Sequence, residues 1–592
     1  MMFKNNLLSI KKKIHTIDIV TLIVVLIGFV AITSISIPYG WRQMCVDGKC
    51  GVYFADRYRA RDELWHMALA SVAYNSYPFK LPIYSGVELQ AYHFLYSFVL
   101  HLLTLLGANV LFAHYVLFPI IWFAIFTLLQ IKISKILFPN TTYAVPIFLF
   151  FSYFSSNFSY ILSLRNHGKF WHDIGYFSNQ PGEYLINPAF TLSILFFSYI
   201  IYVSLKKTWK VYDILGISIT TFLIWGSKFY GGPVVIAYLG MVFVYKVYSR
   251  ELSLRKAFIF ILSNVIMTPL AIIIFYNPFA VAKSSSVFTL DPLKTIHPMV
   301  EDSELLPIRN LALARYYLYS IPGFFKPKLW VIEMFTLAVY LVFSFGTRVF
   351  GFLFIFCKSK TKYFYIISSL TTIVAISFSI LFIQNGSDWF NTIQFLAYGQ
   401  FLMIYLVAGI VVQLISSKKA INVCIASLVI IASFLGSLNP IIKYTSRIYN
   451  LSNLYGYMRA QPPIYLSNPE LEALRFLSRQ NKGVVFSTRN LTKDYSGNRI
   501  EELWQYSDTA YISALSGMQT YLTNIDQLDL MFIDYKKRLR EVDSLHINLF
   551  DGNKFRYIYI HKKDPSFSRV AELAQNKFKV IFENKEVTIY EH

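Results

Sequence analysis

The sequence predicts a polytopic α-helical membrane protein with about eleven transmembrane helices and a small α/β domain at its C-terminus. Three observations support this fold class. Of the 592 residues, 55% are hydrophobic and only 15% are charged, whereas about a quarter of the residues in a typical soluble domain carry charge. Apolar runs of nearly membrane-spanning length follow one another between residues 18 and 440. Lysine and arginine cluster at alternate junctions between these runs.

About eleven apolar segments have the length expected of transmembrane helices. They lie at about 18–38, 109–131, 141–161, 187–205, 211–226, 231–248, 257–277, 330–350, 363–383, 392–416 and 421–440. Residues 90–106 are also apolar, but this stretch is only about 17 residues long. We expect it to lie as an interfacial helix along the outer surface, because counting it as a span would invert every later loop.

The basic residues predict the orientation. Lys4 and Lys11–Lys13 precede the first span, which we interpret as an uncleaved anchor because the apolar run is long and lacks a small-residue cleavage site. The positive-inside rule puts this N-terminus in the cytoplasm of a multi-pass cell-membrane protein. The formal net charge of +22 then reflects topology, and we expect no nucleic-acid partner. The basic clusters between spans lie at 132–135, 206–210, 250–256, 358–362 and 418–419.

Two domains follow from this reading: residues 1–440 as the transmembrane domain, with a first outer loop at 39–108, and residues 441–592 as an extracytoplasmic α/β domain. In that tail, Ser467 or Asn468 can cap a helix over 467–480, with Pro469 in its first turn. A strand after residue 483, a strand over 556–561, a helix near 567–576 and a hairpin over 579–590 complete the predicted elements. The tail has no phosphate loop and no nucleophile elbow.

Two outer loops carry further expectations. Cys45 and Cys50 flank Val-Asp-Gly-Lys in the first outer loop, and Asp-Gly favours a tight hairpin turn. A disulfide is therefore expected in this oxidising location. The outer loop over 278–329 is long enough to act as a mobile lid, but its residues indicate no specific role.

The first outer loop also contains the clearest candidate site. Asp62-Glu63-Leu-Trp-His66 opens an amphipathic segment whose apolar side chains we expect at the membrane interface. Asp62 and His66 are four residues apart, so on a helix they share one face and can bind a divalent cation or share a proton. The alternative is an N-terminal cap on a surface helix. Asp56, six residues upstream, is a rival acid.

An acidic pair that opens an interfacial helix after the first span, followed by a second interfacial helix and more spans, resembles the GT-C superfamily of membrane glycosyltransferases. The layout is most similar to the protein O-mannosyltransferase and aminoarabinose-transferase type. This resemblance implies transfer of a hexose or pentose from a polyprenyl-phosphate donor at the outer face of the membrane. Asp62 and Glu63 match the acidic pair, of which one residue serves in the family as catalytic base or metal ligand.

A lipid-phosphate leaving group requires cations near the membrane surface. A divalent cation, Mg²⁺ or Mn²⁺, is the cofactor we consider, with His66, His172 and Asp173 as its ligands, although the acidic-x-acidic pattern familiar from the superfamily is missing here. The basic residues have an alternative role as headgroup anchors. The candidate substrate- and phosphate-binding residues are Arg57, Arg61, Arg165, Lys169, Lys228 and Asp388.

The expected partners are a lipid-linked sugar donor, a glycan, lipid or protein acceptor, and membrane lipids. Two other functions remain open. A transporter or flippase of lipid-linked glycans should show ionisable groups within spans or internal repeats, and few are evident in this sequence. A non-catalytic membrane scaffold predicts that no carboxylates and cations converge on one outer cavity.

Overall fold

The computed structural model describes residues 19–158, 160–161, 164–165, 168, 185–278, 288–301, 308–323, 326–356, 361–385, 389–448, 463–488, 500–506, 508–545, 549–550, 554–575 and 577–592. The chain divides into two compact units. The first contains Met1–Ile35, Ile121–Ala271 and Ser285–Lys443, and the second contains Ser36–Ile120, Ile272–Ser284 and Tyr444–His592.

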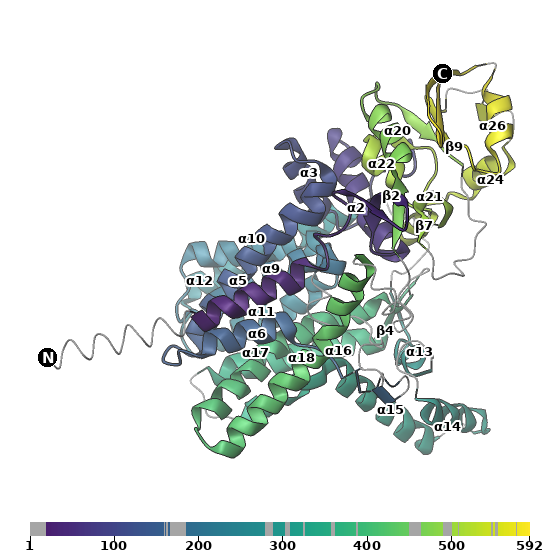
Figure 1. The fold of residues 1–592 in the computed structure, drawn as a ribbon. Coiled ribbons are helices and arrows are strands. Elements are labelled where there is room, and N and C mark those ends of the chain that lie inside the picture. Colours follow the sequence, from purple (N-terminus) through teal and green to yellow (C-terminus); the bar gives the residue numbers. More distant parts are fainter. Residues whose placement is uncertain are drawn as a thin grey trace. The chain divides into compact units, whose positions relative to one another are not determined.

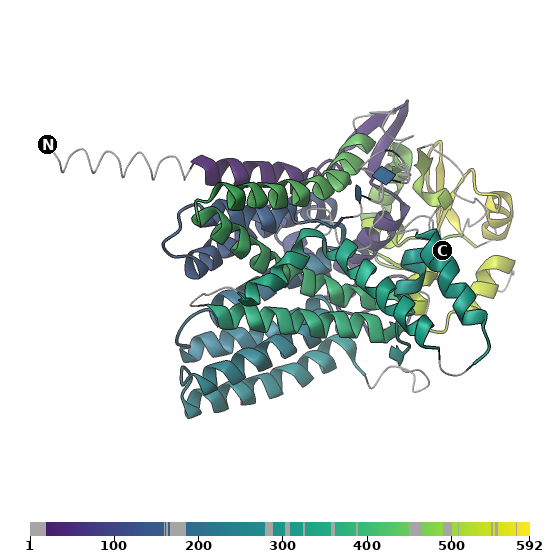
Figure 2. The same cartoon turned by 90° about the horizontal axis from the view of Figure 1, so that it is seen from below.

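The first unit is a helical bundle whose long helices run side by side (Figures 1 and 2). Its elements are α5 (Phe118–Leu137), α6 (Ala144–Phe154), α9 (Pro188–Ser204), α10 (Val211–Ser227), α11 (Gly231–Tyr248), α12 (Leu254–Ala271), β3 (Phe288–Leu290), α13 (Ile296–Glu301), α14 (Arg309–Ser320), α15 (Pro327–Phe345), η4 (Gly346–Phe356), α16 (Lys362–Leu381), β4 (Phe382–Gln384), η5 (Trp389–Ile393), α17 (Gln394–Ser416) and α18 (Ala420–Ile448).

Seven helices are long and apolar enough to cross a membrane, which confirms the polytopic helical class. They are Val110–Leu137, Gly231–Tyr248, Leu254–Tyr276, Pro327–Phe354, Lys362–Leu381, Asn391–Ser416 and Ala420–Leu438. At the other four predicted spans, the described helices are shorter: Ile19–Thr33, Ala144–Phe154, Pro188–Ser204 and Val211–Ser227. The expected count of eleven is therefore not confirmed by helix length. Helix α17 forms the core, since 94% of its apolar window is buried, against 17–50% in the other six long helices.

Helix α6 ends earlier than the predicted span over 141–161, and the packing gives the reason. Beyond Phe154 the chain leaves the helix and fits closely against two glycines of the same unit. A Cβ on Gly346 would lie 2.2 Å from the Ser156 carbonyl oxygen, and a Cβ on Gly436 would lie 2.6 Å from Ser156 Oγ. The Phe158 amide then donates to the Phe343 carbonyl at 2.9 Å. Non-helical backbone within such a bundle is tolerated because the protein itself satisfies its polar groups.

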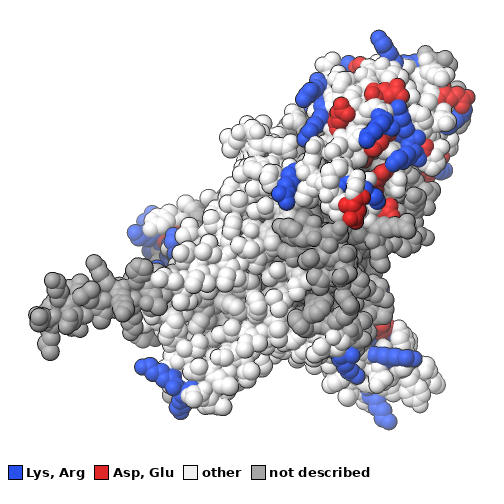
Figure 3. All heavy atoms as spheres, viewed as in Figure 1, with Lys and Arg blue, Asp and Glu red and all other residues white. Residues whose placement is uncertain are grey.

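The surface of the bundle agrees with a membrane location. In the view of Figure 3, the described part of the bundle shows broad areas without charged side chains, and lysine and arginine gather near its ends. The described C-terminal residues carry both signs of charge. This distribution is typical of a multi-pass membrane protein whose remaining residues contact water.

The second unit contains two larger sheets. The first has the order β1-β2-β5-β7, formed by β1 (Gln43–Val46), β2 (Lys49–Phe54), β5 (Ile464–Ser467) and β7 (Glu501–Glu502). The second has the order β10-β11-β9-β6-β8, formed by β10 (Lys579–Glu583), β11 (Val587–Glu591), β9 (Tyr557–His561), β6 (Val484–Phe486) and β8 (Gln519–Thr520). Its helices include α2 (Arg57–Val72), α3 (Leu95–Leu105), α4 (Val110–Phe112), the π-helix η2 (Ala113–Leu117), α20 (Asn468–Ser478), α22 (Tyr511–Ser516), α23 (Ile525–Leu530), α24 (Lys536–Ser544) and α26 (Phe567–Ala574).

The first outer loop and the tail share one sheet, because β2 pairs antiparallel with β5, with Gly51 opposite Ser467. The pairing requires glycine at position 51, since a Cβ there would lie 2.0 Å from the Leu466 carbonyl oxygen. Within the tail, the predicted local elements are confirmed. Ser467 caps α20 by accepting from the Glu470 amide at 3.2 Å, and the strand, helix and hairpin over 556–590 all form.

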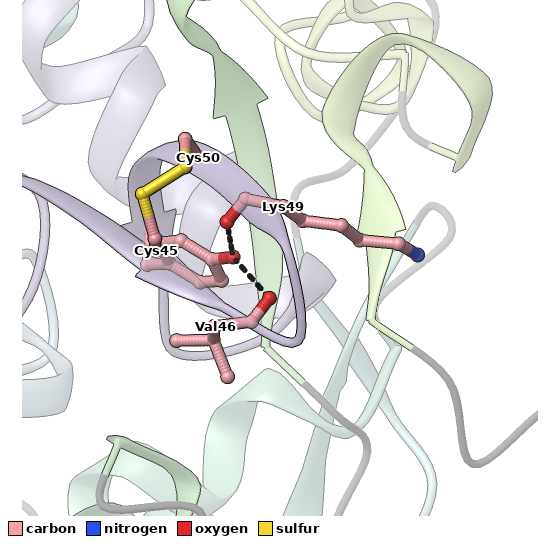
Figure 4. Close-up of a disulfide and its surroundings, with 5 residues drawn as sticks. Cys45, Val46, Lys49 and Cys50 are labelled. Atoms are coloured by element: carbon pink, nitrogen blue, oxygen red, sulfur yellow. Dashed lines mark hydrogen bonds between the residues drawn. A yellow bond between two sulfur atoms is a disulfide. The ribbon is translucent and has the colours of Figure 1, made fainter.

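The predicted disulfide is present. Cys45 and Cys50 are bonded across the β1–β2 hairpin (Figure 4). The Tyr53 hydroxyl donates to the Lys49 carbonyl at 2.5 Å, which ties the turn to the following strand.

Candidate functional site

The candidate site begins where helix α2 starts. Asp56 is the N-cap residue, and its side chain accepts a hydrogen bond from the Arg59 amide at 2.9 Å. Asp56, the rival acid, therefore has a capping function in this structure. The helix differs from the expected interfacial one, because Trp65, Met67 and Leu69 are fully buried within the second unit. Contacts with α3 and α22 of that unit cover the faces that the sequence assigned to the membrane.

Glu63 is completely buried and ion-paired. Arg59, one helical turn earlier, donates through Nε to Glu63 Oε1 at 2.8 Å, and its Nη2 lies 2.7 Å from the same oxygen. The Tyr115 hydroxyl donates to Oε2 at 2.5 Å, and His114 Nε2 lies 3.8 Å from Oε1. Burial, the largest influence, raises the pKa of Glu63, but the Arg59 charge and the contacts with His114 and Tyr115 outweigh it and lower the pKa below its usual value.

The residues that hold Glu63 come from a π-helical turn. His114 and Tyr115 are consecutive in η2, and the wider π-turn lets neighbouring side chains approach one carboxylate. The Tyr96 hydroxyl and His114 Nδ1 are 2.9 Å apart, which extends the cluster to α3. No motif in the sequence marks Tyr96, His114 or Tyr115 as members of this cluster. The spacing of Arg59 and Glu63, four residues apart, was the available indication of their ion pair.

Asp62 has a different environment. Its side chain is 46% exposed, because consecutive residues on an α-helix point about 100° apart. His66 is buried, and its Nε2 lies 4.0 Å from Asp62 Oδ2. On the other side of the ring, Nδ1 lies 2.9 Å from Ser97 Oγ, and the Tyr96 ring packs edge-on at 5.1 Å between centroids. The structure thus brings Asp62 and His66 to one face, as their spacing predicts. Tyr96 links this face to the Glu63 cluster, because its ring packs on His66 and its hydroxyl lies 2.9 Å from His114 Nδ1.

The predicted basic residues of the second unit are only partly described. Arg61 forms an ion pair with Asp526 of α23. Arg57 lies in α2, but its side chain is outside the described part. Lys169, His172, Asp173 and Asp388 lie outside the described residues, and Arg165 is exposed to solvent.

Lys228 belongs to the first unit, at the C-terminal end of α10. Its side chain is largely buried, with Nζ 6.0 Å from the centre of the Tyr230 ring. The Tyr230 hydroxyl donates to Gln384 Oε1 at 2.5 Å, and Thr289 Oγ1 donates to Asn385 Oδ1 at 2.9 Å. The structure therefore brings the Lys228 turn to the polar stretch that immediately precedes Asp388.

Of the four side chains considered for the metal, Asp62 and His66 lie next to each other in the structure. Asp62 and His66 are close enough to contribute two ligands, while no three His, Cys, Asp or Glu side chains of the described residues form a group that could hold a metal. The other two predicted ligands, His172 and Asp173, fall in the part of the chain that is not described.

No protein-family model and no characterised protein matches this sequence. The structure aligns with solved structures of an archaeal oligosaccharyltransferase and of ArnT. An archaeal oligosaccharyltransferase, AglB from Archaeoglobus fulgidus in complex with an inhibitory peptide and dolichol-phosphate, aligns at 10% identity and a TM-score of 0.44, covering 94% of this chain and 71% of that one. The same archaeon's oligosaccharyltransferase in complex with zinc and sulfate aligns at 10% identity and a TM-score of 0.44, covering 96% of this chain and 73% of that one. ArnT from Cupriavidus metallidurans bound to undecaprenyl phosphate aligns at 11% identity and a TM-score of 0.40, covering 97% of both chains.

Proposed function

We propose that this protein is an integral-membrane glycosyltransferase of the GT-C type. It transfers a hexosyl or pentosyl group from a polyprenyl-phosphate donor to a glycan, lipid or protein acceptor at the outer face of the cell membrane. Its N-terminus is cytoplasmic, and its second unit, with the C-terminal α/β domain, is extracytoplasmic.

One observation carries the proposal. Two consecutive carboxylates lie in the second turn of α2, which begins at Arg57 and not at the acidic pair. Glu63 is buried in an ion pair, and Asp62 is half exposed beside His66. The buried pair fixes the first turns of the helix, so the exposed carboxylate is held in a defined position. A general base needs this combination of access and fixed geometry.

In the proposed reaction, an acceptor hydroxyl oxygen attacks the anomeric carbon of the donor sugar. Asp62 takes the proton from that oxygen as the new glycosidic bond forms. The bond between the anomeric carbon and the phosphate oxygen breaks, and its electron pair leaves with the lipid phosphate. His66, buried against Ser97, orients the Asp62 carboxylate through the 4.0 Å approach of Nε2 and is a positioning residue.

The leaving phosphate requires positive charge. Lys228, Arg57, Arg61, Arg165 and Lys169 are the proposed sources, and Asp388 is a proposed contact for the sugar or for a bound cation. A divalent cation, with ligands from Asp62, His66, His172 and Asp173, would supply additional charge at the phosphate. Arg61 already shares its charge with Asp526, so its contribution depends on that pair.

Substitution Asp62→Asn tests the proposal in membranes supplied with polyprenyl-phosphate sugars. We expect loss of transfer by a factor of about 10² or more, the usual contribution of a general base, with unchanged thermal stability. Asp543→Asn, a change at an exposed carboxylate of α24, is the matched control and should retain full transfer. Undiminished transfer by folded Asp62→Asn protein would exclude Asp62 as the base.

The rival function, transport of a lipid-linked glycan, makes the opposite prediction. Translocation of a labelled lipid-linked glycan across vesicles containing the pure protein, with no glycosidic bond formed and no effect of Asp62→Asn, would favour transport.

A further inference from the structure

Helix α14 has an outward face that no described residue covers. Leu313, Tyr316 and Tyr317 follow the helical spacing i, i+3, i+4 and are 55%, 53% and 68% exposed. Tyr319 beyond them is 68% exposed. An apolar and aromatic stripe of this kind on a solvent-exposed helix is typical of an interaction surface.

The opposite face of α14 is fastened to α13 and α15 of the same unit. Arg315 pairs with Glu301 of α13 and lies 3.9 Å from Glu333 Oε1 of α15. His297 of α13 contacts the other Glu333 oxygen at 2.8 Å. The Tyr316 hydroxyl donates to Glu301 Oε2 at 2.6 Å, and the Arg315 guanidinium lies 4.8 Å from the centre of the Tyr316 ring, so the ring is held in place while the residue remains 53% exposed. The outward face is therefore presented by a fixed helix.

The charges around this face are basic. Arg309 at the start of α14 and Lys328 at the start of α15 are exposed, and the Lys326 ammonium donates to the Tyr319 carbonyl at 2.7 Å. The nearby described carboxylates, Glu301 and Glu333, are both engaged with Arg315 or His297. Figure 3 shows lysine and arginine projecting where α14 lies in Figure 1, with little acidic surface beside them.

The position of α14 in the fold indicates what meets this face. Helix α15 begins at Pro327, within the membrane-crossing candidate Pro327–Phe354, so α14 lies where the chain enters the bilayer. Trp330 and Val331, near the start of α15, are 60% and 68% exposed. Tyrosine and tryptophan concentrate at the headgroup level of membranes, and adjacent basic side chains attract anionic lipids.

We infer that α14 is a lipid-docking helix that lies in the membrane interface and binds anionic phospholipid, with Leu313, Tyr316 and Tyr317 in the headgroup–acyl boundary. Arg309 and Lys328 contact lipid phosphates. This assigns a function to the predicted outer loop over 278–329, and it holds whether or not the protein is a glycosyltransferase.

The test uses the full chain in nanodiscs. Cys357 and Cys424 are replaced by alanine, the Cys45–Cys50 disulfide is kept, and Tyr317→Cys is spin-labelled. Collision rates with oxygen and with a water-soluble nickel chelate then report immersion, and a label at Lys537→Cys on α24 is the water-exposed reference. We expect the label at 317 to favour oxygen and to move deeper when phosphatidylglycerol replaces half of the phosphatidylcholine.

Arg309→Ala and Lys328→Ala should each weaken the preference for anionic lipid about fivefold, because one basic residue near an anionic surface contributes about 1 kcal/mol. A thermal melt of each variant shows that it is folded. Nickel accessibility at 317 equal to that at 537 in both lipids overturns the inference. Shielding from both oxygen and nickel also overturns it, since that result indicates a protein covering the face.

Discussion

The buried pair of Arg59 and Glu63 leads to the sharpest prediction about stability. In Glu63→Gln, Arg59 remains charged and buried with its partner neutralised. Removing one member of a buried pair costs about 3–5 kcal/mol. The second unit has about 250 residues, a size for which each kcal/mol shifts Tm by about 2–4 °C, so we expect a fall on the order of 10 °C.

The measurement is thermal unfolding of the detergent-solubilised full chain by intrinsic fluorescence, at one fixed scan rate because such melts are often rate-controlled. The compensating variant is Arg59→Met with Glu63→Gln, which removes the uncompensated charge and leaves Tyr115 a side-chain oxygen as acceptor. This double variant should recover most of the lost Tm.

The pH dependence has a defined sign. Because the folded-state pKa of Glu63 lies below its ordinary value, its stabilising contribution is present above the unfolded pKa and is lost as pH falls through the folded pKa. The difference in Tm between the native chain and Glu63→Gln should therefore become smaller as the pH falls below about 4.5. An unchanged Tm for Glu63→Gln together with lost transfer would refute the positioning role and make Glu63 a direct participant.

Three further predictions concern other parts of the chain. Burial, followed by the charges of two nearby glutamates, raises the pKa of Glu470 to about 8. The unfolded chain loses this proton first, so the stability of the native chain falls as pH rises from about 4.5 to 8. The stability of Glu470→Gln relative to the native chain should therefore increase over that range by up to about 1.4 kcal/mol per pH unit in matched melts. The Arg61–Asp526 pair is partly exposed, so a double-mutant cycle with alanine should give a stability coupling below about 1 kcal/mol, and a larger value would show that it holds the tail. Lys228→Met should raise the KM for a lipid-phosphate donor about tenfold or more with little change in Tm, since one charge-assisted contact contributes about 1.5–3 kcal/mol; an unchanged KM in donor titrations removes Lys228 from the site.

Local elements of the tail could be predicted because each is specified by neighbouring residues. Ser467 and Pro469 define the start of α20 through capping and the fixed backbone angle of proline in the first turn. Asn584 likewise marks the turn between β10 and β11, where its side chain accepts from the Val587 amide at 2.9 Å. These interactions span at most a few residues, so the sequence pattern contains them.

Long-range pairings were not predictable in the same way. Nothing in Gly51 or Leu466 alone indicates that their strands pair across most of the chain. The burial of Glu63 depends on His114 and Tyr115, which approach it through a π-helical turn that apolar periodicity does not reveal. The early end of α6 depends on Gly346, which is distant in sequence. In each case the deciding contact is tertiary.

The two acids of α2 also show why adjacency in sequence does not mean shared chemistry. On a helix, neighbouring side chains point about 100° apart, so burial of one face sends Glu63 to Arg59 and leaves Asp62 at the surface. The energetic demands on the two are opposite. A buried carboxylate must be paired to remain charged, and pairing lowers its ability to take a proton; an exposed one retains that ability but needs a rigid support. The pair can therefore serve a proton-transfer site only if the roles are divided, with Glu63 fixing the helix and Asp62 meeting the acceptor.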